Sequence, residues 1–231
     1  MCLDLDRNKL RSIAGISKLC NLKKLILSKN EIVDFPDEIQ SLVRLEKLEL
    51  NQNQIRVIPE GVFCHLPRLK HLRLNNNRLS ALPRDLAACR GSLQYLNISN
   101  NLFRTFPQPV LQLACLQELH VQNNALRQLP RELFQGQSLK MVKASGNPLR
   151  EPPSEVCAGG IQQIQNYFNQ LQHSACHPRH QPPHVSAELV WIHSGVGEQK
   201  KGSHHFHPCL LFSPPEELAL PLPLVAHHSF N

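Results

Sequence analysis

The sequence predicts an α/β fold: a repeat solenoid (horseshoe) with a parallel concave β-sheet, short 3₁₀ or α-helical convex segments, a C-terminal cap helix and a disordered tail. Three observations predict it. An asparagine recurs every 22 to 24 residues, leucines keep a fixed spacing around it, and an apolar-proline pair follows it by five or six residues. This regularity indicates about seven copies of one unit. The asparagines are Asn8, Asn30, Asn53, Asn77, Asn101, Asn124 and Asn147.

Each repeat contains one predicted β-strand. The frame is L-x-x-L-x-L-x-x-N-x-L, and its x-Leu-x-Leu-x portion alternates with the two-residue period of a strand that has one buried face. The leucines should therefore point inward and the x residues outward. Seven stacked strands at ~4.8 Å spacing would span roughly 29 Å. The frame fits residues 22–32, 45–55, 69–79, 93–103, 116–126 and 139–149, and a partial copy occupies 3–10.

The asparagine and the proline of each repeat are predicted to be structural. An amide side chain both donates and accepts, so it can satisfy backbone groups that the turn after the strand leaves unpaired. Stacked copies would form an asparagine ladder. Proline fixes φ and suits the first turn of a short helix, so residues 36–42 and 83–88 are expected to form a turn or two of 3₁₀ or α-helix.

These residues resemble the leucine-rich repeat family over roughly residues 1–171. The apolar-proline pairs resemble those of an intracellular subgroup typified by Ras-pathway scaffolds, whereas the first repeat has no such proline and its residues 14–16 are more similar to the phosphatase-regulator subgroup. The resemblance implies a scaffold or adaptor in intracellular signalling, near small GTPases or phosphatases. The pairs are Phe35-Pro36, Ile58-Pro59, Leu82-Pro83, Phe106-Pro107 and Leu129-Pro130.

The repeats are expected to occupy residues 1–149, followed by a C-terminal cap at 150–174. A solenoid must cover its apolar core at each end. The cap has apolar residues on one face of an amphipathic helix, namely Ile161, Ile164, Phe168 and Leu171. The first strand lacks such a cover and would be an exposed edge. This favours a fragment or alternative product of a longer repeat protein, although a frayed first repeat that serves as its own cap is the other interpretation.

Residues 175–231 differ in composition from the repeats. They are rich in histidine and proline, the repeat frame stops, and the segment is expected to be disordered. Cys176 and Cys209 lie among histidines, but neither has a partner cysteine at the short spacing of a structural zinc site. No metal site is therefore predicted, and any binding in vitro would be adventitious.

Several functional classes are disfavoured. No phosphate-binding loop, nucleophile elbow or zinc-protease motif occurs, so no enzymatic activity and no cofactor or small-molecule substrate are expected. The net charge of +7 is spread through the repeats without a basic arm, which argues against nucleic-acid binding. No apolar run reaches the ~20 residues of a membrane span. With no signal peptide and no CxxC pair, the cysteines are expected to be reduced and the protein cytoplasmic or nuclear.

The outward x positions of the sheet are the predicted partner-binding surface, because the core does not need them. Lys24, Lys47 and His71 follow one another in one column, so their positive charges should reinforce one another, with Glu49 offsetting part of the effect. An acidic, partly apolar protein surface is the expected partner. The alternative is a regulatory or substrate-recognition subunit of a larger enzyme complex. The predicted contact residues are Lys24, Lys47, Glu49, His71, Arg73, Tyr95, Asn97, Glu118 and His120.

Overall fold

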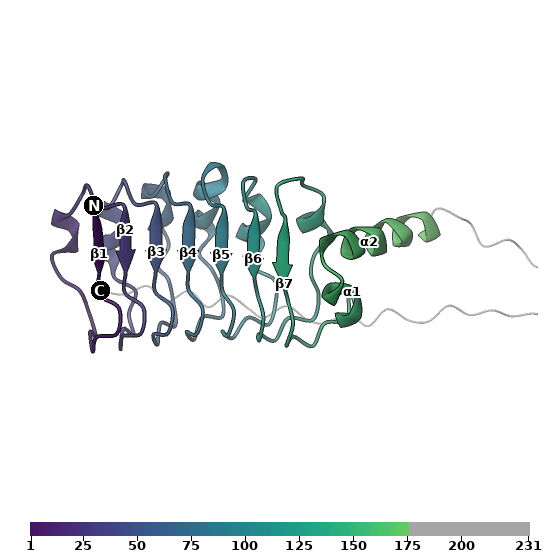
Figure 1. Ribbon diagram of the computed structural model, residues 1–231, viewed down its shortest axis with the longest axis horizontal. Helices are drawn as coiled ribbons and strands as arrows, with labels where there is room; N and C mark the ends of the chain where they lie inside the picture. The colour runs from purple at the N-terminus through teal and green to yellow at the C-terminus, as the bar shows by residue number, and fades with distance from the viewer. Residues whose placement is uncertain (176–231) are drawn as a thin grey trace, which may run out of the picture. The chain divides into compact units, whose positions relative to one another are not determined.

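A computed structural model of the 231-residue chain describes residues 1–175. Seven short strands form one open parallel sheet in chain order, which confirms the predicted solenoid (Figure 1). Each strand therefore pairs only with the strands of adjacent repeats. The strands are β1 (Cys2–Asp4), β2 (Lys24–Ile26), β3 (Lys47–Glu49), β4 (His71–Arg73), β5 (Tyr95–Asn97), β6 (Glu118–His120) and β7 (Met141–Lys143).

One side of the sheet is buried and the other faces solvent. The central leucines of β2 to β6 have no exposed surface, and burial of such a side chain is worth about 1.5–3 kcal/mol. Their neighbours on either side point the opposite way, as the two-residue period requires. We call this solvent-facing side the concave face. The central leucines of these strands are Leu25, Leu48, Leu72, Leu96 and Leu119.

The repeated asparagines form the expected ladder. Asn77 Nδ2 donates to the carbonyls of Leu74 in its own repeat and Leu50 in the preceding one, both at 3.0 Å. Its Oδ1 accepts from the Ile55 N–H at 3.1 Å. Each amide thereby joins two repeats, so the ladder stabilises the stacking and not only the turn. The same three bonds are made by Asn30, Asn53, Asn101, Asn124 and Asn147.

The residue before each ladder asparagine adopts a left-handed backbone conformation. Its φ lies between 52° and 58° in the first six repeats and is 69° at Gly146 in the seventh. Such a φ is unfavourable for most residues and tolerated best by glycine and asparagine, which occupy several of these positions. The turn after each strand therefore depends on a second position besides the ladder. The six non-glycine residues are Arg7, Lys29, Gln52, Asn76, Asn100 and Asn123.

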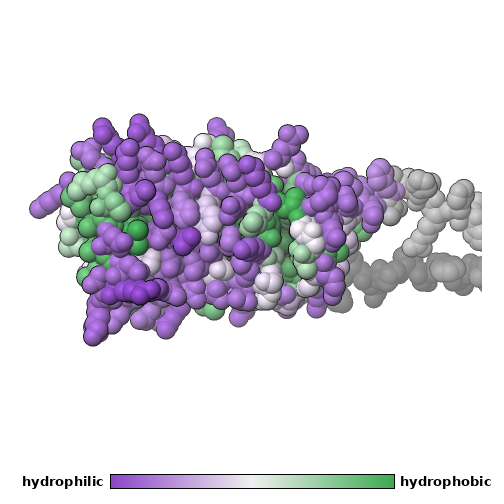
Figure 2. All heavy atoms as spheres, viewed as in Figure 1, coloured by the Kyte–Doolittle hydropathy of each residue, from purple (hydrophilic) through white to green (hydrophobic). Residues whose placement is uncertain are grey.

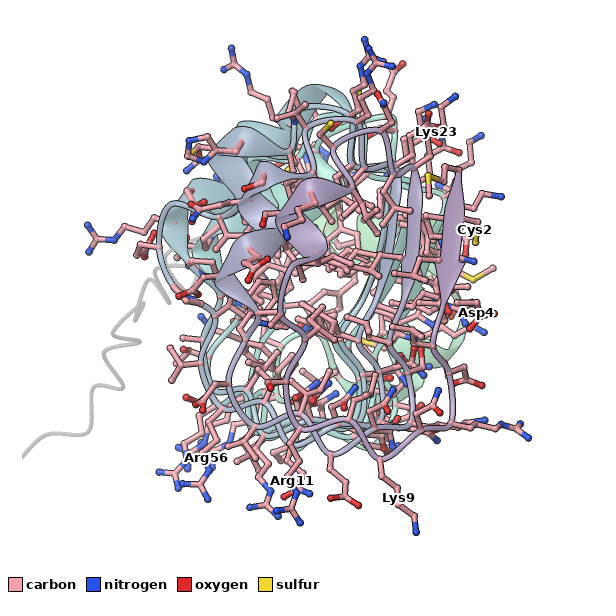
Figure 3. The ribbon with its side chains drawn as sticks, turned by 90° about the vertical axis from the view of Figure 1, so that its left-hand side faces the viewer. Cys2, Asp4, Lys9, Arg11, Lys23 and Arg56 are labelled. Carbon is pink, nitrogen blue, oxygen red and sulfur yellow. The ribbon has the colours of Figure 1, made fainter. Side chains whose placement is uncertain are left out.

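Short 3₁₀ helices lie on the convex side, opposite the sheet (Figure 3). Four of them begin directly after a proline in an extended conformation, as the proline pattern predicts. The helices are η1 (Ile16–Lys18), η2 (Asp37–Ser41), η3 (Phe63–His65), η4 (Arg84–Gly91), η5 (Gln108–Gln112) and η6 (Arg131–Phe134).

Two α-helices cover the end of the solenoid beyond β7 (Figure 1). They are α1 (Ser154–Ala158), which the sequence did not predict, and α2 (Ile161–Ala175). Ile164 is fully buried, and the Phe168 ring stacks on Phe134 with centroids 5.8 Å apart. Leu171 was expected on the same buried face but is 44% exposed, because α2 extends past the last repeat. The expected tail, 175–231, lies outside the described residues except for Ala175.

The opposite end of the solenoid is open. Leu3 and Leu5 are only partly buried, whereas the equivalent leucines of the second repeat, Leu25 and Leu27, have no exposed surface. Apolar residues gather at this end of the array (Figure 2), and the end-on view shows the side chains that lie between the sheet and the 3₁₀ helices (Figure 3). The two ends of the array therefore differ in how completely the core is covered.

Candidate partner-binding surface

The parallel register aligns the outward side chains of the concave face in two columns. Lys24, Lys47 and His71 follow one another in the first column, as the sequence predicts. The first is Cys2, Lys24, Lys47, His71, Tyr95, Glu118 and Met141; the second is Asp4, Ile26, Glu49, Arg73, Asn97, His120 and Lys143.

Glu49 lies at the centre of the charges in the middle repeats. This residue is only 8% exposed, and its Oε1 lies 2.8 Å from Lys47 Nζ and 3.6 Å from Arg73 Nε. The sequence predicted cations here that reinforce one another, with Glu49 offsetting part of the effect. The structure instead places one buried carboxylate between two of them. The carboxylate cancels one of the two positive charges, so the cluster is much less basic than a continuous stripe of cations would be.

His71 completes this group as a neutral side chain. Burial, together with the nearby cations Arg73 and Lys47, lowers the pKa of His71 to about 4, and the nearby carboxylates offset only part of this. Its Nε2 accepts a hydrogen bond from Arg73 Nε at 3.1 Å. At neutral pH, His71 therefore acts as an aromatic acceptor, and its 3.7 Å approach to Glu49 Oε1 is not an ion pair.

Three rings form a continuous row across β4, β5 and β6, which we call the aromatic row: His71, Tyr95 and His120. His71 and Tyr95 stack at 4.1 Å between centroids with an interplanar angle of 10°, and Tyr95 lies 5.1 Å from the tilted His120 ring. The Arg73 guanidinium lies over Tyr95, 5.5 Å from its centroid. The side chains are thus held by one another, so little rotamer entropy remains to be lost on binding.

Two buried polar atoms at and just after strand β6 have no hydrogen-bond partner within residues 1–175. They are His120 Nε2 and Gln122 Oε1. Burial, with Lys143 nearby, lowers the pKa of His120, so its 3.8 Å separation from Glu118 Oε2 is not a strong ion pair. Buried polar atoms without partners are uncommon and mark places where a ligand group or water can bind. Gln122 was not among the predicted contact residues, although its position in line with Ser99 was a signal.

The predicted contact residues divide into a central group and a periphery. The structure brings together Lys47, Glu49, His71, Arg73, Tyr95 and His120. Asn97 lies beside this group, with its Nδ2 3.4 Å from the Tyr95 hydroxyl. Glu118 lies at its edge, within 3.8 Å of His120. Lys24 is exposed on β2 and makes no ion pair in the part of the chain that the structure describes.

The comparison with known families agrees with the repeat pattern. The profile described as leucine rich repeat matches residues 1–55, 20–79, 43–103 and 67–126. Together these matches cover residues 1–126, more than half of the 231 residues. The chain belongs to the leucine-rich repeat family. Domains of this family generally mediate protein–protein interaction and are typically non-enzymatic scaffolds.

One curated relative shares a short stretch of repeats with this leucine-rich repeat chain. It is the volume-regulated anion channel subunit LRRC8E of Xenopus laevis, which is 42% identical over 64 residues. That stretch covers 26% of this chain and 8% of the channel subunit. The chain therefore spans only a small part of that relative's length. No helix within residues 1–175 is long and apolar enough to cross a membrane.

Solved structures share the fold of these leucine-rich repeats. A leucine-rich repeat protein of Leptospira interrogans, LIC12759, has a TM-score of 0.60 and 34% identity over 64% of this chain and 37% of its own. A plant ice-binding protein is 29% identical with a TM-score of 0.56, and the match covers 64% of this chain and 49% of that protein. A TDR receptor is also 29% identical with a TM-score of 0.57, and the match covers 64% of this chain and 27% of the receptor. Their names indicate different roles, so the shared fold does not select a ligand.

The described residues contain no group that suggests a metal centre. Within residues 1–175, no three histidine, cysteine or acidic side chains converge as metal ligands. The six cysteines of this part are free. The histidine-rich segment with Cys176 and Cys209 lies outside the described residues.

Proposed function

We propose that this leucine-rich repeat chain is a scaffold or adaptor that binds a protein partner on its concave face. The observation that carries the proposal is the aromatic row with Arg73 and the paired Lys47 and Glu49. These side chains contribute nothing to the core, yet they are fixed by mutual contacts at 2.8 to 5.5 Å. Tyrosine and arginine at the centre of a face are the residue types that dominate binding energy at protein interfaces.

The chemistry of the partner follows from the groups around the row. Lys24 and Lys143 flank it, both are exposed, and neither makes an ion pair within residues 1–175. The Glu49 carboxylate already pairs with Lys47 and Arg73 and is only 8% exposed, so it offers little charge to a partner. We therefore propose a partner that places an apolar or aromatic group on the row and acidic groups toward the flanking lysines. Charge complementarity of this kind acts mainly on the association rate and its salt dependence.

The proposed setting is intracellular signalling in the cytoplasm or nucleus, as for the Ras-pathway-scaffold subgroup. The apolar-proline pairs before η2, η4, η5 and η6 support this assignment, because they are the feature on which the resemblance to that subgroup rests. We propose no channel, ice-binding or receptor activity for this chain.

Affinity capture with matched variants tests the proposal. The full chain, Tyr95→Ser and Tyr167→Ser are immobilised at equal amounts, and the proteins that each recovers from a cell lysate are quantified by mass spectrometry. Tyr167 is the matched control because it is half-buried on α2, away from the concave face. We expect Tyr95→Ser to lower recovery of the main partner by roughly tenfold or more, and Tyr167→Ser to leave it unchanged.

A convex variant provides the opposite arm of the test. Arg84→Glu with Arg131→Glu reverses two charges on η4 and η6. Melting temperatures within about 2 °C of wild type establish that all variants are folded. Loss of the partner from the convex variant, with retention by Tyr95→Ser, would show that the concave face is not the binding surface.

A further inference from the structure

The turns that follow the strands run along one edge of the solenoid (Figure 1). Neighbouring turns are joined directly, for example where the Arg150 N–H donates to Arg127 O at 2.7 Å. Residues at equivalent positions of adjacent turns therefore lie at about the strand spacing, ~4.8 Å. At this edge the side chains of Lys9, Arg11 and Arg56 point away from the body of the protein (Figure 3).

Five exposed arginines belong to these turns in repeats three to seven, and we call the surface they form the arginine edge. None of their side chains makes an ion pair or a hydrogen bond within residues 1–175. Among the four residues that follow the ladder asparagine in these five repeats, Glu151 is the one carboxylate. The members of the arginine edge are Arg56, Arg78, Arg104, Arg127 and Arg150.

The fold holds like charges close together along this edge. Arg104, Arg127 and Arg150 each lie three residues after a ladder asparagine, in three adjacent repeats, so their backbones are separated by ~4.8 Å per repeat. On the opposite edge, by contrast, the carboxylate of Glu46 lies within 3.8 Å of two lysine ammonium groups. Mutual repulsion of the three arginines opposes the compact state, and an external anionic surface would relieve it.

Exposed apolar side chains stand among these arginines. Val57 is 70% exposed, Leu102 is 56% exposed and Val33 is 41% exposed. Val57 directly follows Arg56, and Leu102 lies two residues before Arg104 in the same turn. Protruding apolar groups beside unpaired cations are the combination that binds an anionic lipid surface, because apolar burial and electrostatic attraction then add.

We propose that the arginine edge docks on an anionic phospholipid surface, with its guanidinium groups on lipid phosphates and Val57 and Leu102 in the headgroup region. Arginine donates paired N–H groups to phosphate, and clusters of about four to eight basic residues bind anionic membranes. A flat lipid surface can contact every arginine of a row of turns at once. A nucleic acid fits less well, because the turns of this edge within residues 1–175 contain no helix and no exposed aromatic ring.

Docking at this edge leaves the concave face open. The strands run toward the turns of the edge, and the outward side chains of the sheet, such as Cys2 and Asp4, point to the side (Figure 3). On a lipid surface the strands would therefore stand upright, with the aromatic row accessible from solution. Lipid docking and partner binding use different side chains, so the two can be tested separately.

Vesicle co-sedimentation with paired neutralisations tests the docking. The full chain is mixed with vesicles of phosphatidylcholine alone or with phosphatidylserine as about a third of the lipid, and we expect it to bind only the latter. Arg104→Gln with Arg127→Gln should weaken binding about 25-fold, since each basic residue near an anionic surface contributes roughly fivefold. Arg44→Gln with Arg68→Gln is the matched control, because it removes two exposed arginines that precede β3 and β4 at the opposite edge. Salt screens those charges from the lipid, so the affinity should change less than about twofold.

A second pair of substitutions tests the apolar part of the contact. Val57→Ser with Leu102→Ser keeps every charge, so it should weaken binding roughly tenfold while the dependence on salt stays as in wild type. Melting temperatures within about 2 °C of wild type establish that the variants are folded. Tyr95→Ser should bind vesicles as wild type does, so failure of the concave-face proposal would leave this one standing.

Three results would overturn the lipid assignment. The first is no binding of the folded chain to the phosphatidylserine vesicles. The second is an equal loss from both arginine pairs, which would reflect net charge and not this edge. The third concerns a fluorescent single-stranded oligonucleotide, measured by anisotropy at the same salt: tighter binding than to the vesicles, lost in Arg104→Gln with Arg127→Gln, would assign the edge to nucleic acid instead.

Discussion

Lys47 Nζ and Glu49 Oε1 lie 2.8 Å apart on the same strand, and the carboxylate side chain is only 11% exposed. Two residues apart on β3, they lie on the same outward face. This ion pair offsets one of the two positive charges of Lys47 and Arg73, and the same carboxylate lies 3.6 Å from Arg73 Nε and 3.7 Å from His71 Nε2. The concave face is consequently organised around Glu49.

Glu49→Gln should therefore destabilise the solenoid by about 1–2 kcal/mol, because it leaves Lys47 and Arg73 close together without a counter-charge. Urea unfolding measures the change. Glu46→Gln is the matched control, since Glu46 also contacts two lysines but has a side chain that is 32% exposed. Its loss should have a clearly smaller effect, because ion pairs of exposed side chains contribute little. Equal effects of the two substitutions would contradict the central role of Glu49.

The lowered pKa of His71 predicts a dependence of stability on pH. The folded state holds this pKa at about 4, below the ordinary value of 6.5, so the unfolded chain binds more protons between these values. The free energy of unfolding therefore rises with pH across this window and is lost as pH falls through it. His71→Phe keeps a ring against Tyr95 but cannot titrate, so it should flatten this part of the profile. The exposed His65 provides the control: His65→Phe should leave the wild-type slope in place.

Interruption of the asparagine ladder should destabilise the fold more in the middle than at the open end. Asn77→Ala leaves three backbone groups of two repeats without partners, which predicts a loss of about 2–4 kcal/mol. Asn8 is exposed, and its Nδ2 bonds only within its own turn, to Leu5 and Asp6. Asn8→Ala should therefore cost less than about 1 kcal/mol. Chemical unfolding of both variants checks the difference, and similar losses would show that the contact between repeats contributes little.

The cap helix offers a comparison between two apolar residues of similar size. Ile164 is fully buried, so Ile164→Ala should cost about 2–5 kcal/mol. Leu171 is 44% exposed, so Leu171→Ala should change the free energy of unfolding by less than about 0.5 kcal/mol. Phe168 is partly buried against Phe134, and its truncation should fall between them. A large loss at Leu171 would mean that α2 packs differently.

The parts of the fold that repeat were predictable, because seven copies of one pattern show which residues share a role. The repeat period alone predicts which positions hold the inward leucines, the ladder asparagines and the outward side chains of the sheet. The left-handed residue before each asparagine was missed, because Arg7, Lys29 and Gln52 carry no local signal for a positive φ. The common geometry of the turn imposes that conformation.

The candidate site was predictable in position and not in electrostatics. A column places Glu49 beside Lys47 and Arg73, but it does not show that the carboxylate is 8% exposed or that burial keeps His71 neutral. These properties depend on rotamers and on how closely the strands pack. Leu171 was misplaced for a related reason: helical period gives the face of α2 but not where the last repeat ends beneath it.

Hydroxyl-radical footprinting of the captured complex tests the central claim most directly, because the chain has two tyrosines and they lie on different surfaces. Tyr95 belongs to the aromatic row, and Tyr167 lies on the cap helix. If the partner binds the concave face, the oxidation rate of Tyr95 falls several-fold in the complex while that of Tyr167 stays as in the free protein. Unchanged oxidation of Tyr95, with protection of Tyr167, would contradict binding at the concave face.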